Sequence, residues 1–419
     1  MRTIYTVLLH AALPWILARL WWRGRREPGY REAIAERFGR SELVPKAKLL
    51  WLHAVSVGEV RACAPLVRAL QRENPDHDVL ITCLTAAGRD TAKQVYGESV
   101  LLAYLPYDTP WAVRRFLEHY RPRLGVLVET EIWPNLMRAC AELGVPVMLA
   151  NARMSRKSVQ AYQRLRWLSR PAFANLGAVC AQGPADARRL RRLGAANVSI
   201  AGNLKFDIEP DADKAAEGKS FRAALRHRKV LLLASTREGE EEQLLGALGA
   251  QDDGVLIMLV PRHQRRFDEV AALAARMGFT LARRSLGEAP HQGRRLYLGD
   301  TMGEMAFYFA MCDVAVIGGS FEPLGGQNLI EASAAGVPVV TGPHMFNFAD
   351  VTRLAVEAEA ALQAPDAAAA VRAARSLLED PERCARMGIA GKRLCAQHRG
   401  AAERHLAACR ALLRAAGPG

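Results

Sequence analysis

The segment HAVSVGE (53–59) places a carboxylate just after a predicted strand-to-helix turn. The apolar run 49–52 precedes it, and apolar residues from Val60 to Leu70 recur at roughly helical spacing, so Glu59 is expected in the first turn of a helix. Open α/β sheets bind ligands at the carboxyl ends of their strands, where a glutamate can take a proton from a substrate hydroxyl. The same residues match the S-x-x-E capping box, in which Glu59 only satisfies the backbone. Both interpretations stay open at this point.

Two further carboxylates, Glu129 and Glu131, follow another predicted strand and open the segment ETEIWPN (129–135). If that strand persists, these two side chains point in similar directions and Thr130 points away. Two carboxylates on adjoining loops fit a general base and an orienting or stabilising partner. The alternative for Glu131 is neutralisation of a nearby Arg or Lys.

Basic residues on the next loop, NARMSRKS (151–158), would favour an anionic acceptor, although isolated basic residues more often form a solvated face. We therefore predict an acceptor site in the first half of the chain. Its predicted residues are Ser56, Gly58, Arg153 and Arg156.

The loops of the second half are rich in Gly, Ser and Arg. Glycines let a backbone approach a phosphate, helix N-termini favour anions, and the arginine fork suits phosphate. Glu331, just after GGQN, can accept hydrogen bonds from a ribose. The sequence therefore predicts a nucleotide site from four segments: STR (235–237), PRH (261–263), GGS (318–320) and GGQNLIE (325–331).

Short apolar runs alternate with helical patterns through both halves, which predicts parallel sheets covered on both faces. The predicted strands are AKLLWLHAV, HDVLITCL, RLGVLVET, VPVMLAN and LGAVCAQ, then RKVLLLAS, GVLIMLVP, RLYLGD, DVAVIGG and VPVVTG. The polar segment 206–220 is predicted to be a linker between the halves. Its one D-x-D, Asp211 to Asp213, is interpreted as solvated and not as a metal site.

The N-terminus has the pattern of an uncleaved membrane anchor. Residues 3–22 are almost entirely apolar, and about 20 residues are just enough to cross a bilayer as a helix. Tryptophans at the end of this run suit an interface, and Arg23, Arg25 and Arg26 follow, which keeps the body of the chain in the cytoplasm. We predict an anchor that either spans or lies in the membrane interface. A buried core helix is the alternative.

The net charge of +14, from 57 Lys and Arg against 43 Asp and Glu, suggests an anionic partner. Nucleic acid is not expected, because aromatic residues are few and no helix-turn-helix, RNA-recognition or zinc-finger signature occurs. Eight scattered cysteines without a C-x-x-C pair indicate neither a zinc site nor a disulfide framework. The anionic partner is therefore expected to be a membrane surface or a phosphorylated substrate.

The predicted fold class is α/β: two facing, doubly wound Rossmann-like domains, as in the GT-B architecture, with an N-terminal membrane-anchor helix. The predicted segments are the anchor at 1–25, an acceptor-binding domain at 26–208, a donor-binding domain at 209–385 and a helical tail at 386–419.

As a set, the motifs resemble the family of 3-deoxy-D-manno-octulosonic acid (Kdo) transferases, from the anchor to about residue 350. The motifs that carry the resemblance are HAVSVGE, YLPYDTPWAVRRF, ETEIWPN, NARMSRKS, GNLKFD, LVPRHQRRF, GDTMGEM, GGSFEPLGGQNLIEA and GPHMFNF. The resemblance implies an inverting transfer of Kdo from CMP-Kdo to a lipid A precursor (lipid IVA) in lipopolysaccharide core biosynthesis. It also implies a place on the cytoplasmic side of the inner membrane.

The resemblance assigns roles to individual residues. Glu59 corresponds to the catalytic base, Glu129 to a transition-state stabiliser and Lys205 of GNLKFD to a further functional position. The donor-binding residues predicted from the loops and the resemblance together are Arg262, His263, Met302, Gly303, Glu304, Gly318, Gly319, Ser320, Asn328, Leu329, Ile330 and Glu331. No metal or other cofactor is expected, because the leaving group is a single phosphate that loop N–H groups and arginine can stabilise.

Two other functions remain open. One is another membrane-surface GT-B transferase that uses a UDP-sugar and releases UDP. The other is a non-catalytic anchored protein that binds a nucleotide, against which the joint presence of Glu59, Glu129, Arg262 and Glu331 argues, since a binding module needs no base.

Overall fold

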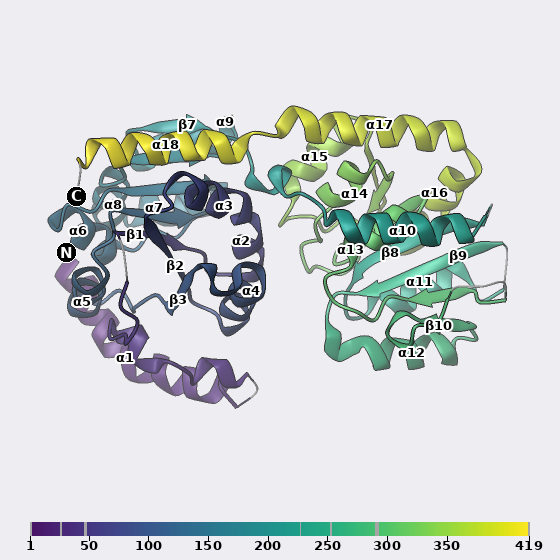
Figure 1. Cartoon of the computed structure of the whole chain (residues 1–419), viewed down its shortest axis with the longest axis horizontal. Coiled ribbons are helices and arrows are strands. Elements are labelled where there is room, and N and C mark those ends of the chain that lie inside the picture. Colours follow the sequence, from purple (N-terminus) through teal and green to yellow (C-terminus); the bar gives the residue numbers. More distant parts are fainter. Residues whose placement is uncertain are drawn as a thin grey trace. The chain divides into compact units, whose positions relative to one another are not determined.

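A computed structural model describes residues 2–25, 27–45, 48–226, 228–251, 254–289 and 293–417 (Figure 1). The chain forms two compact units: residues 1–208 with 398–419, and residues 209–397. Arg26 of the predicted basic flank and Ala47 of the first predicted strand lie outside the described residues.

The first unit is built on a parallel sheet in the order β3-β2-β1-β4-β5-β6-β7. Its strands are β1 (Lys48–His53), β2 (His77–Cys83), β3 (Leu101–Tyr104), β4 (Leu124–Val128), β5 (Val147–Ala152), β6 (Ala178–Ala181) and β7 (Val198–Ile200). Strand β4 is buried along its whole length, as expected for a strand covered on both faces. Trp51 at the centre of β1 is completely buried; its ring packs edge-on against Phe116, with centroids 5.3 Å apart.

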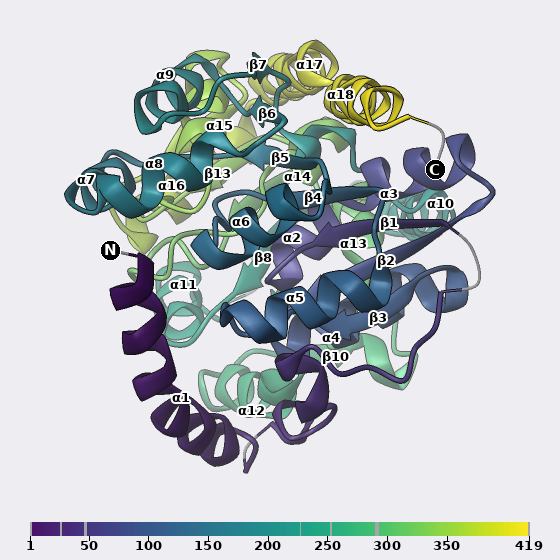
Figure 2. The same ribbon diagram turned by 90° about the vertical axis from the view of Figure 1, so that its left-hand side faces the viewer.

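The helices of this unit cover both faces of its sheet, except for α1, which is largely exposed. They are α1 (Arg2–Arg23), α2 (Val57–Ala62), α3 (Ala64–Glu73), α4 (Ala86–Tyr96), α5 (Pro110–Tyr120), α6 (Pro134–Glu142), α7 (Arg156–Arg164), α8 (Arg166–Ala174), α9 (Pro184–Leu193) and α18 (Ala401–Ala415), with the 3-10 helices η1 (Pro28–Tyr30), η2 (Ile34–Phe38), η3 (Gly97–Ser99) and η4 (Leu204–Asp207). The last helix, α18, lies beside α3 (Figures 1 and 2), and its Leu406 and Cys409 belong to the core on that face. The end of the chain therefore completes the first unit.

The second unit has a parallel sheet in the order β10-β11-β9-β8-β12-β13-β14. Its strands are β8 (Lys229–Thr236), β9 (Val255–Pro261), β10 (Leu281–Arg283), β11 (Leu296–Leu298), β12 (Val314–Ile317), β13 (Val339–Thr341) and β14 (Ala361–Gln363). Its helices are α10 (Ala212–Ala224), α11 (Glu240–Leu248), α12 (Phe267–Arg276), α13 (Met305–Met311), α14 (Ile330–Ala335), α15 (Ala349–Glu357), α16 (Ala367–Glu379) and α17 (Pro381–His398), with the 3-10 helices η5 (Gln264–Arg266) and η6 (Arg284–Leu286). The predicted α/β class with two doubly wound parallel sheets is confirmed.

Both sheets reverse their strand order at one place. In the first unit the chain leaves β1 toward β2 and β3 and returns on the other side as β4; in the second it leaves β8 toward β9 and returns as β12. Ligands of open α/β sheets bind beyond the carboxyl ends of the two strands at such a switch point. The site is therefore expected after β1 and β4 in one unit and after β8 and β12 in the other.

The boundary predicted near residue 210 is confirmed, because the two units divide between residues 208 and 209, but most of the predicted linker is helical. Residues 212–224 form helix α10, whose N-cap is Asp211: its Oδ1 accepts hydrogen bonds from the N–H groups of Asp213 (3.1 Å) and Lys214 (3.0 Å). The helix has few large apolar residues because it packs by close backbone approach. A Cβ added at the buried Gly218 would lie 2.3 Å from the carbonyl oxygen of Phe307.

The N-terminal helix α1 is long and apolar enough to cross a membrane, and only 6 % of its apolar stretch is buried (Figure 2). The alternative of a buried core helix is therefore wrong.

Candidate active site

Glu59 lies in the first turn of α2, shortly after β1, at the switch point of the first sheet. Ser56 is the N-cap of α2, and the Glu59 carboxylate accepts hydrogen bonds from the Val55 N–H (2.8 Å) and the Ser56 hydroxyl (2.9 Å). The capping interpretation of Ser56 and Glu59 is thus confirmed as local geometry. It does not exclude chemistry, because these bonds also hold the carboxylate in one orientation.

The electrostatics of this turn make Glu59 unusual among surface carboxylates. Burial, followed by the Glu129 carboxylate, raises the pKa of Glu59 from 4.5 to about 7, while the bonds from Val55 and Ser56 oppose the rise. Glu131 adds a smaller contribution in the same direction. A carboxylate whose pKa lies near the operating pH is well suited to act as a general base.

Glu129 does not continue the strand as the sequence predicted. Strand β4 ends at Val128, and Glu129 has φ +61°, a left-handed conformation that is uncommon for a residue other than glycine. The Glu129 N–H still donates to the Ala150 carbonyl oxygen (2.9 Å). The prediction that Glu129 and Glu131 extend one strand face is therefore wrong. The turn nevertheless brings both carboxylates to Glu59, because β4 pairs directly with β1.

The Glu131 carboxylate accepts a hydrogen bond from the Trp133 indole N–H (3.1 Å). Burial raises the pKa of Glu131. Among the described residues Glu131 forms no ion pair, so the alternative that it neutralises a neighbouring Arg or Lys is wrong.

Lys205 supplies a half-buried cation to the same cluster. It lies in η4, after β7, and burial lowers the pKa of its ammonium group, with Glu129 and Glu59 opposing the fall and Arg153 adding to it. Lys205 therefore interacts electrostatically with Glu59, Glu129 and Arg153 at one edge of the sheet. Arg156 opens α7 with an exposed side chain, and Gly58 lies in the first turn of α2.

The sequence motifs did not reveal the residues that support Lys205. His405 of α18 is buried, and its Nε2 accepts a hydrogen bond from the Asn151 N–H (2.8 Å), while its Nδ1 pairs with the Ala401 carbonyl oxygen (2.7 Å). Asn151 in turn accepts a bond from the Leu204 N–H through its Oδ1 (3.1 Å). Burial lowers the pKa of His405 to about 4, so the ring is neutral at pH 7 and can accept. No local pattern marks a contact that joins residues 254 positions apart.

The predicted donor residues of the second unit follow strands β11, β9 and β12 at the carboxyl edge of the sheet, where β8 lies between β9 and β12. Arg262 and His263 follow β9; Met302, Gly303 and Glu304 follow β11; Gly318, Gly319 and Ser320 follow β12; and Asn328, Leu329, Ile330 and Glu331 surround the start of α14. At that start Asn328 donates to Glu331 Oε1 (3.0 Å) and accepts from the Ile330 N–H (3.1 Å).

Arginines make this edge electropositive. Burial lowers the pKa of His263 below its usual value, and the guanidinium groups of Arg237 and Arg262 lower it further. His263 is therefore neutral at pH 7, and the positive charge beside it comes from arginine. Such an edge suits a phosphate-bearing ligand.

Glu304 is already paired within the protein. Its carboxylate accepts from Lys214 of α10 (2.7 Å) and from Arg284 (3.0 and 3.1 Å), and the Arg284 bond, ahead of the others, lowers its pKa to about 2. The side chain thus fixes the turn of Met302 and Gly303 against α10. Any contact of this turn with a nucleotide is left to its backbone and to the exposed Met302.

Among the described residues, no group of three or more His, Cys, Asp or Glu side chains could hold a metal ion. Asp211 and Asp213 serve the start of α10. The absence of a cofactor in the reaction remains a prediction.

Two doubly wound units with loop clusters at the carboxyl edges of their sheets have the GT-B architecture. Residues 292–394 match the family model described as glycosyl transferases group 1. The whole fold is similar to that of a putative UDP-N-acetylglucosamine 2-epimerase from Listeria monocytogenes (TM-score 0.60, 13 % identity, 87 % of this chain and 96 % of that one covered). At this identity the likeness concerns the fold alone.

Sequence comparison gives the family. Residues 32–208 match the model described as 3-deoxy-D-manno-octulosonic-acid transferase (kdotransferase). The chain is 44 % identical to the 3-deoxy-D-manno-octulosonic acid transferase of Bordetella pertussis (97 % of this chain, 98 % of the relative) and 35 % identical to that of Haemophilus influenzae (97 % of each). The chain belongs to the Kdo transferase family.

Proposed function

We propose that this chain transfers Kdo from CMP-Kdo to a hydroxyl group of a lipid A precursor (lipid IVA), with Glu59 as the general base. The observation that carries the proposal is the half-buried Glu59 carboxylate with a pKa near 7, fixed by two hydrogen bonds at the switch point of its sheet. The acceptor hydroxyl gives its proton to Glu59 as its oxygen bonds to the anomeric carbon of Kdo. The bond from that carbon to the CMP oxygen breaks, its electron pair leaves with CMP, and the anomeric configuration inverts.

The neighbours of Glu59 have separate tasks in this proposal. Glu129 stabilises the positive charge that develops on the anomeric carbon, and its strained turn keeps the carboxylate aimed at the cluster. Lys205 and Arg153 attract the anionic groups of the acceptor, and Lys205 also limits the rise in the pKa of Glu59, so that Glu59 can ionise at neutral pH. In the second unit, Arg262 and the helix start at Asn328 to Glu331 bind CMP.

The purified full chain tests this proposal in an assay of nucleotide release. With CMP-Kdo and the tetraacylated lipid A precursor, CMP release is expected to depend on the acceptor, and the lipid product is expected to gain the mass of Kdo. Folded protein that releases no CMP here but releases UDP from a UDP-sugar would replace the proposal with the UDP-sugar alternative. Nucleotide binding without release from any donor would favour the non-catalytic alternative.

The membrane surface is the second part of the proposal. Helix α1 is tied to the first unit at both ends. Near its start Tyr5 donates to Asp108 (2.9 Å) and His10 accepts from the Trp111 indole (3.1 Å); near its end Leu20 is buried and the Trp21 carbonyl accepts from Arg31 (2.9 Å). A helix with both ends on one folded unit cannot have those ends on opposite sides of a bilayer.

We therefore propose that α1 lies in the plane of the membrane, on the cytoplasmic side of the inner membrane. Its exposed apolar residues would enter the lipid; they include Ile4, Val7, Leu8, Trp15, Trp21 and Trp22. Arg19 and Arg25 stack on tryptophan rings of the same helix, at 5.6 and 4.5 Å from the ring centroids. Each basic residue near an anionic leaflet adds about 1 kcal/mol of attraction.

Replacing Trp15 and Trp22 together by serine is expected to weaken binding to vesicles that contain phosphatidylglycerol by roughly tenfold or more, because two large aromatic surfaces no longer leave water. Co-sedimentation measures the effect. Trp167→Ser, which removes an exposed tryptophan from α8, is the control and should bind as the wild type does. Undiminished binding of the double variant would contradict the in-plane placement of α1.

A further inference from the structure

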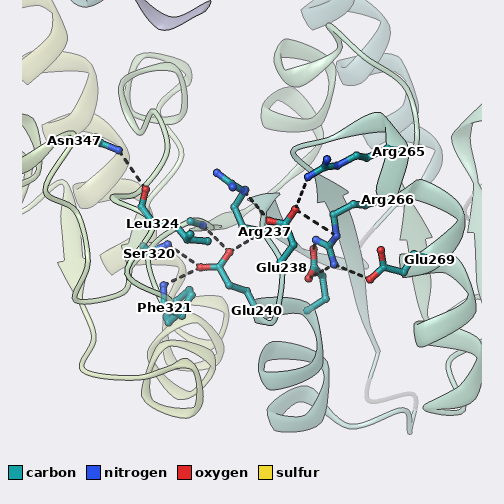
Figure 3. Close-up of polar contacts among 12 residues, drawn as sticks. Arg237, Glu238, Glu240, Arg265, Arg266, Glu269, Ser320, Phe321, Leu324 and Asn347 are labelled. Atoms are coloured by element: carbon teal, nitrogen blue, oxygen red, sulfur yellow. Dashed lines mark hydrogen bonds and ion pairs between the residues drawn. The ribbon is translucent and has the colours of Figure 1, made fainter. Parts of the chain in front are cut away.

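A buried carboxylate occupies the switch point of the second sheet (Figure 3). Glu240 is completely buried, and its Oε2 accepts hydrogen bonds from the N–H groups of Arg237 (2.8 Å) and Gly319 (2.6 Å). Its Oε1 accepts from the N–H groups of Ser320 and Phe321, both at 2.8 Å. A carboxylate offers about four lone-pair positions, so Glu240 is saturated by backbone donors alone.

The four donors come from the two loops that flank the switch point. Arg237 follows β8, and residues 319–321 follow β12, its neighbour in the sheet. The loops approach so closely that a Cβ at Gly318 would lie 2.6 Å from the Cα of Thr236. Ser320 secures the second loop further: its hydroxyl accepts from the Gly342 N–H (2.8 Å). The loops are therefore held around Glu240 as a preformed ring of N–H groups.

This ring is where a doubly wound domain would bind the second phosphate of a nucleoside diphosphate. In such domains the phosphates lie against the turn after the first strand and the N-terminus of the helix that follows. Here that strand is β8, and the helix is α11, which begins at Glu240 and has glutamates at its first three positions. The glycine-rich loop GGS thus does not offer the N–H groups of Gly319 and Ser320 to a ligand, because Glu240 already takes them.

We propose that Glu240 is a specificity-determining residue that restricts the donor to one phosphate. Its carboxylate takes the N–H groups that a second phosphate would need, and its negative charge repels that phosphate. The inference rests on the proposed function in that it assigns nucleotide binding to this edge. The inference goes beyond the proposed function because it explains why the leaving group is a nucleoside monophosphate.

The test compares the binding of CMP and CDP to the full chain by titration calorimetry. Wild type should bind CDP no more tightly than CMP. In Glu240→Gln the single amide oxygen can accept from only some of the four N–H groups, and the negative charge is lost. The remaining N–H groups become available, so the affinity for CDP relative to CMP should rise by about tenfold. Glu240→Asp keeps the charge and should retain the wild-type ratio.

Glu241→Gln is the matched control. Glu241 is also buried, but its carboxylate pairs with Arg266 (2.7 and 3.2 Å) and not with the ring. Both glutamine variants raise the net charge by one, so a general charge effect would appear in both. The inference is overturned if the affinity for CDP relative to CMP rises equally in both variants, or if it is unchanged in folded Glu240→Gln. It is also overturned if the wild type binds CDP more tightly than CMP.

The same titrations with UMP and UDP separate this inference from the donor proposal. Preference for uridine over cytidine nucleotides would refute the CMP donor, while the ratio of mono- to diphosphate affinity would still decide the role of Glu240. Glu240→Ala, which releases all four N–H groups, gives a second reading of that ratio should Glu240→Gln fail to fold. A ratio that rises in Glu240→Ala supports the inference, and an unchanged ratio refutes it.

Discussion

Glu59→Gln is expected to lower kcat for Kdo transfer by about 10²- to 10⁴-fold, the contribution of a positioned general base. Glutamine keeps an oxygen that can accept from the Val55 N–H, so the turn survives, but the amide cannot take the proton of the acceptor hydroxyl. Acceptor-dependent CMP release measures the loss, and CMP affinity, which belongs to the other unit, should not change.

Thr85→Ala is the control for the structural role of Glu59. Thr85 is the N-cap of α4 and donates to the Val55 carbonyl oxygen (3.0 Å), so its loss disturbs a cap and the same turn without removing a base. A cap costs about 0.5–2 kcal/mol of stability. If Thr85→Ala slows transfer as much as Glu59→Gln does, or if Glu59→Gln turns over normally, Glu59 is a capping residue and not the base.

The second large effect is expected from Lys205→Met, read as a pH profile. A base must be ionised, so kcat/KM of the wild type should rise with pH and level off above the Glu59 pKa of about 7. Glu59 raises the pKa of Lys205, and by reciprocity the ammonium group stabilises the Glu59 carboxylate. Without it the pKa of Glu59 rises, the acid limb moves to higher pH, and activity at pH 7 falls by about tenfold or more.

The direction of the shift distinguishes this role from simple loss of structure. A variant that is merely less stable loses activity at all pH values alike, and its acid limb stays in place. Lys219→Met, which removes an exposed cation from α10, is the control and should keep the wild-type profile. If the acid limb of the kcat/KM profile is unchanged in Lys205→Met, or moves to lower pH, the coupling of Lys205 to Glu59 is refuted. The other carboxylates that act on Glu59, Glu129 and Glu131, are unchanged in this variant.

The central strands of both sheets were predictable from the sequence, and the edges were not. All ten predicted strands exist, because a strand buried on both faces must be a continuous apolar run. The strands that the patterns missed are β3, β7, β10 and β14, which are the outer strands of the two sheets. An edge strand is short and partly solvated: β7, with the sequence VSI, has two exposed residues out of three. It therefore lacks the apolar signal that marks its neighbours.

The candidate site was likewise predictable from the sequence only in part. The motifs located Glu59, Glu129 and Lys205, because loops after parallel strands meet at one edge whatever their internal shape. They could not predict the left-handed turn at Glu129, since glycine is the usual signal for that conformation and this position carries a glutamate. Nor could they show that the GGS loop encloses a carboxylate, because Glu240 reaches the loop from 79 residues away.

The first unit is made of two segments of the chain that are synthesised at different times, because the whole second unit lies between them. Residues 1–208 leave the ribosome first, but Leu406 and Cys409, which cover α3, and His405, which satisfies the Asn151 N–H, come only after residues 209–397. At about 5–20 residues per second, that segment takes roughly 10 to 40 s to make. For this time the apolar residues of α3 that pack against α18 lack their cover, and the Asn151 N–H lacks its acceptor, while α1 has already been made. On the proposed placement of α1, the enzyme would thus reach the membrane before its candidate active site is complete, because α18, which completes the first unit, is made after the second unit.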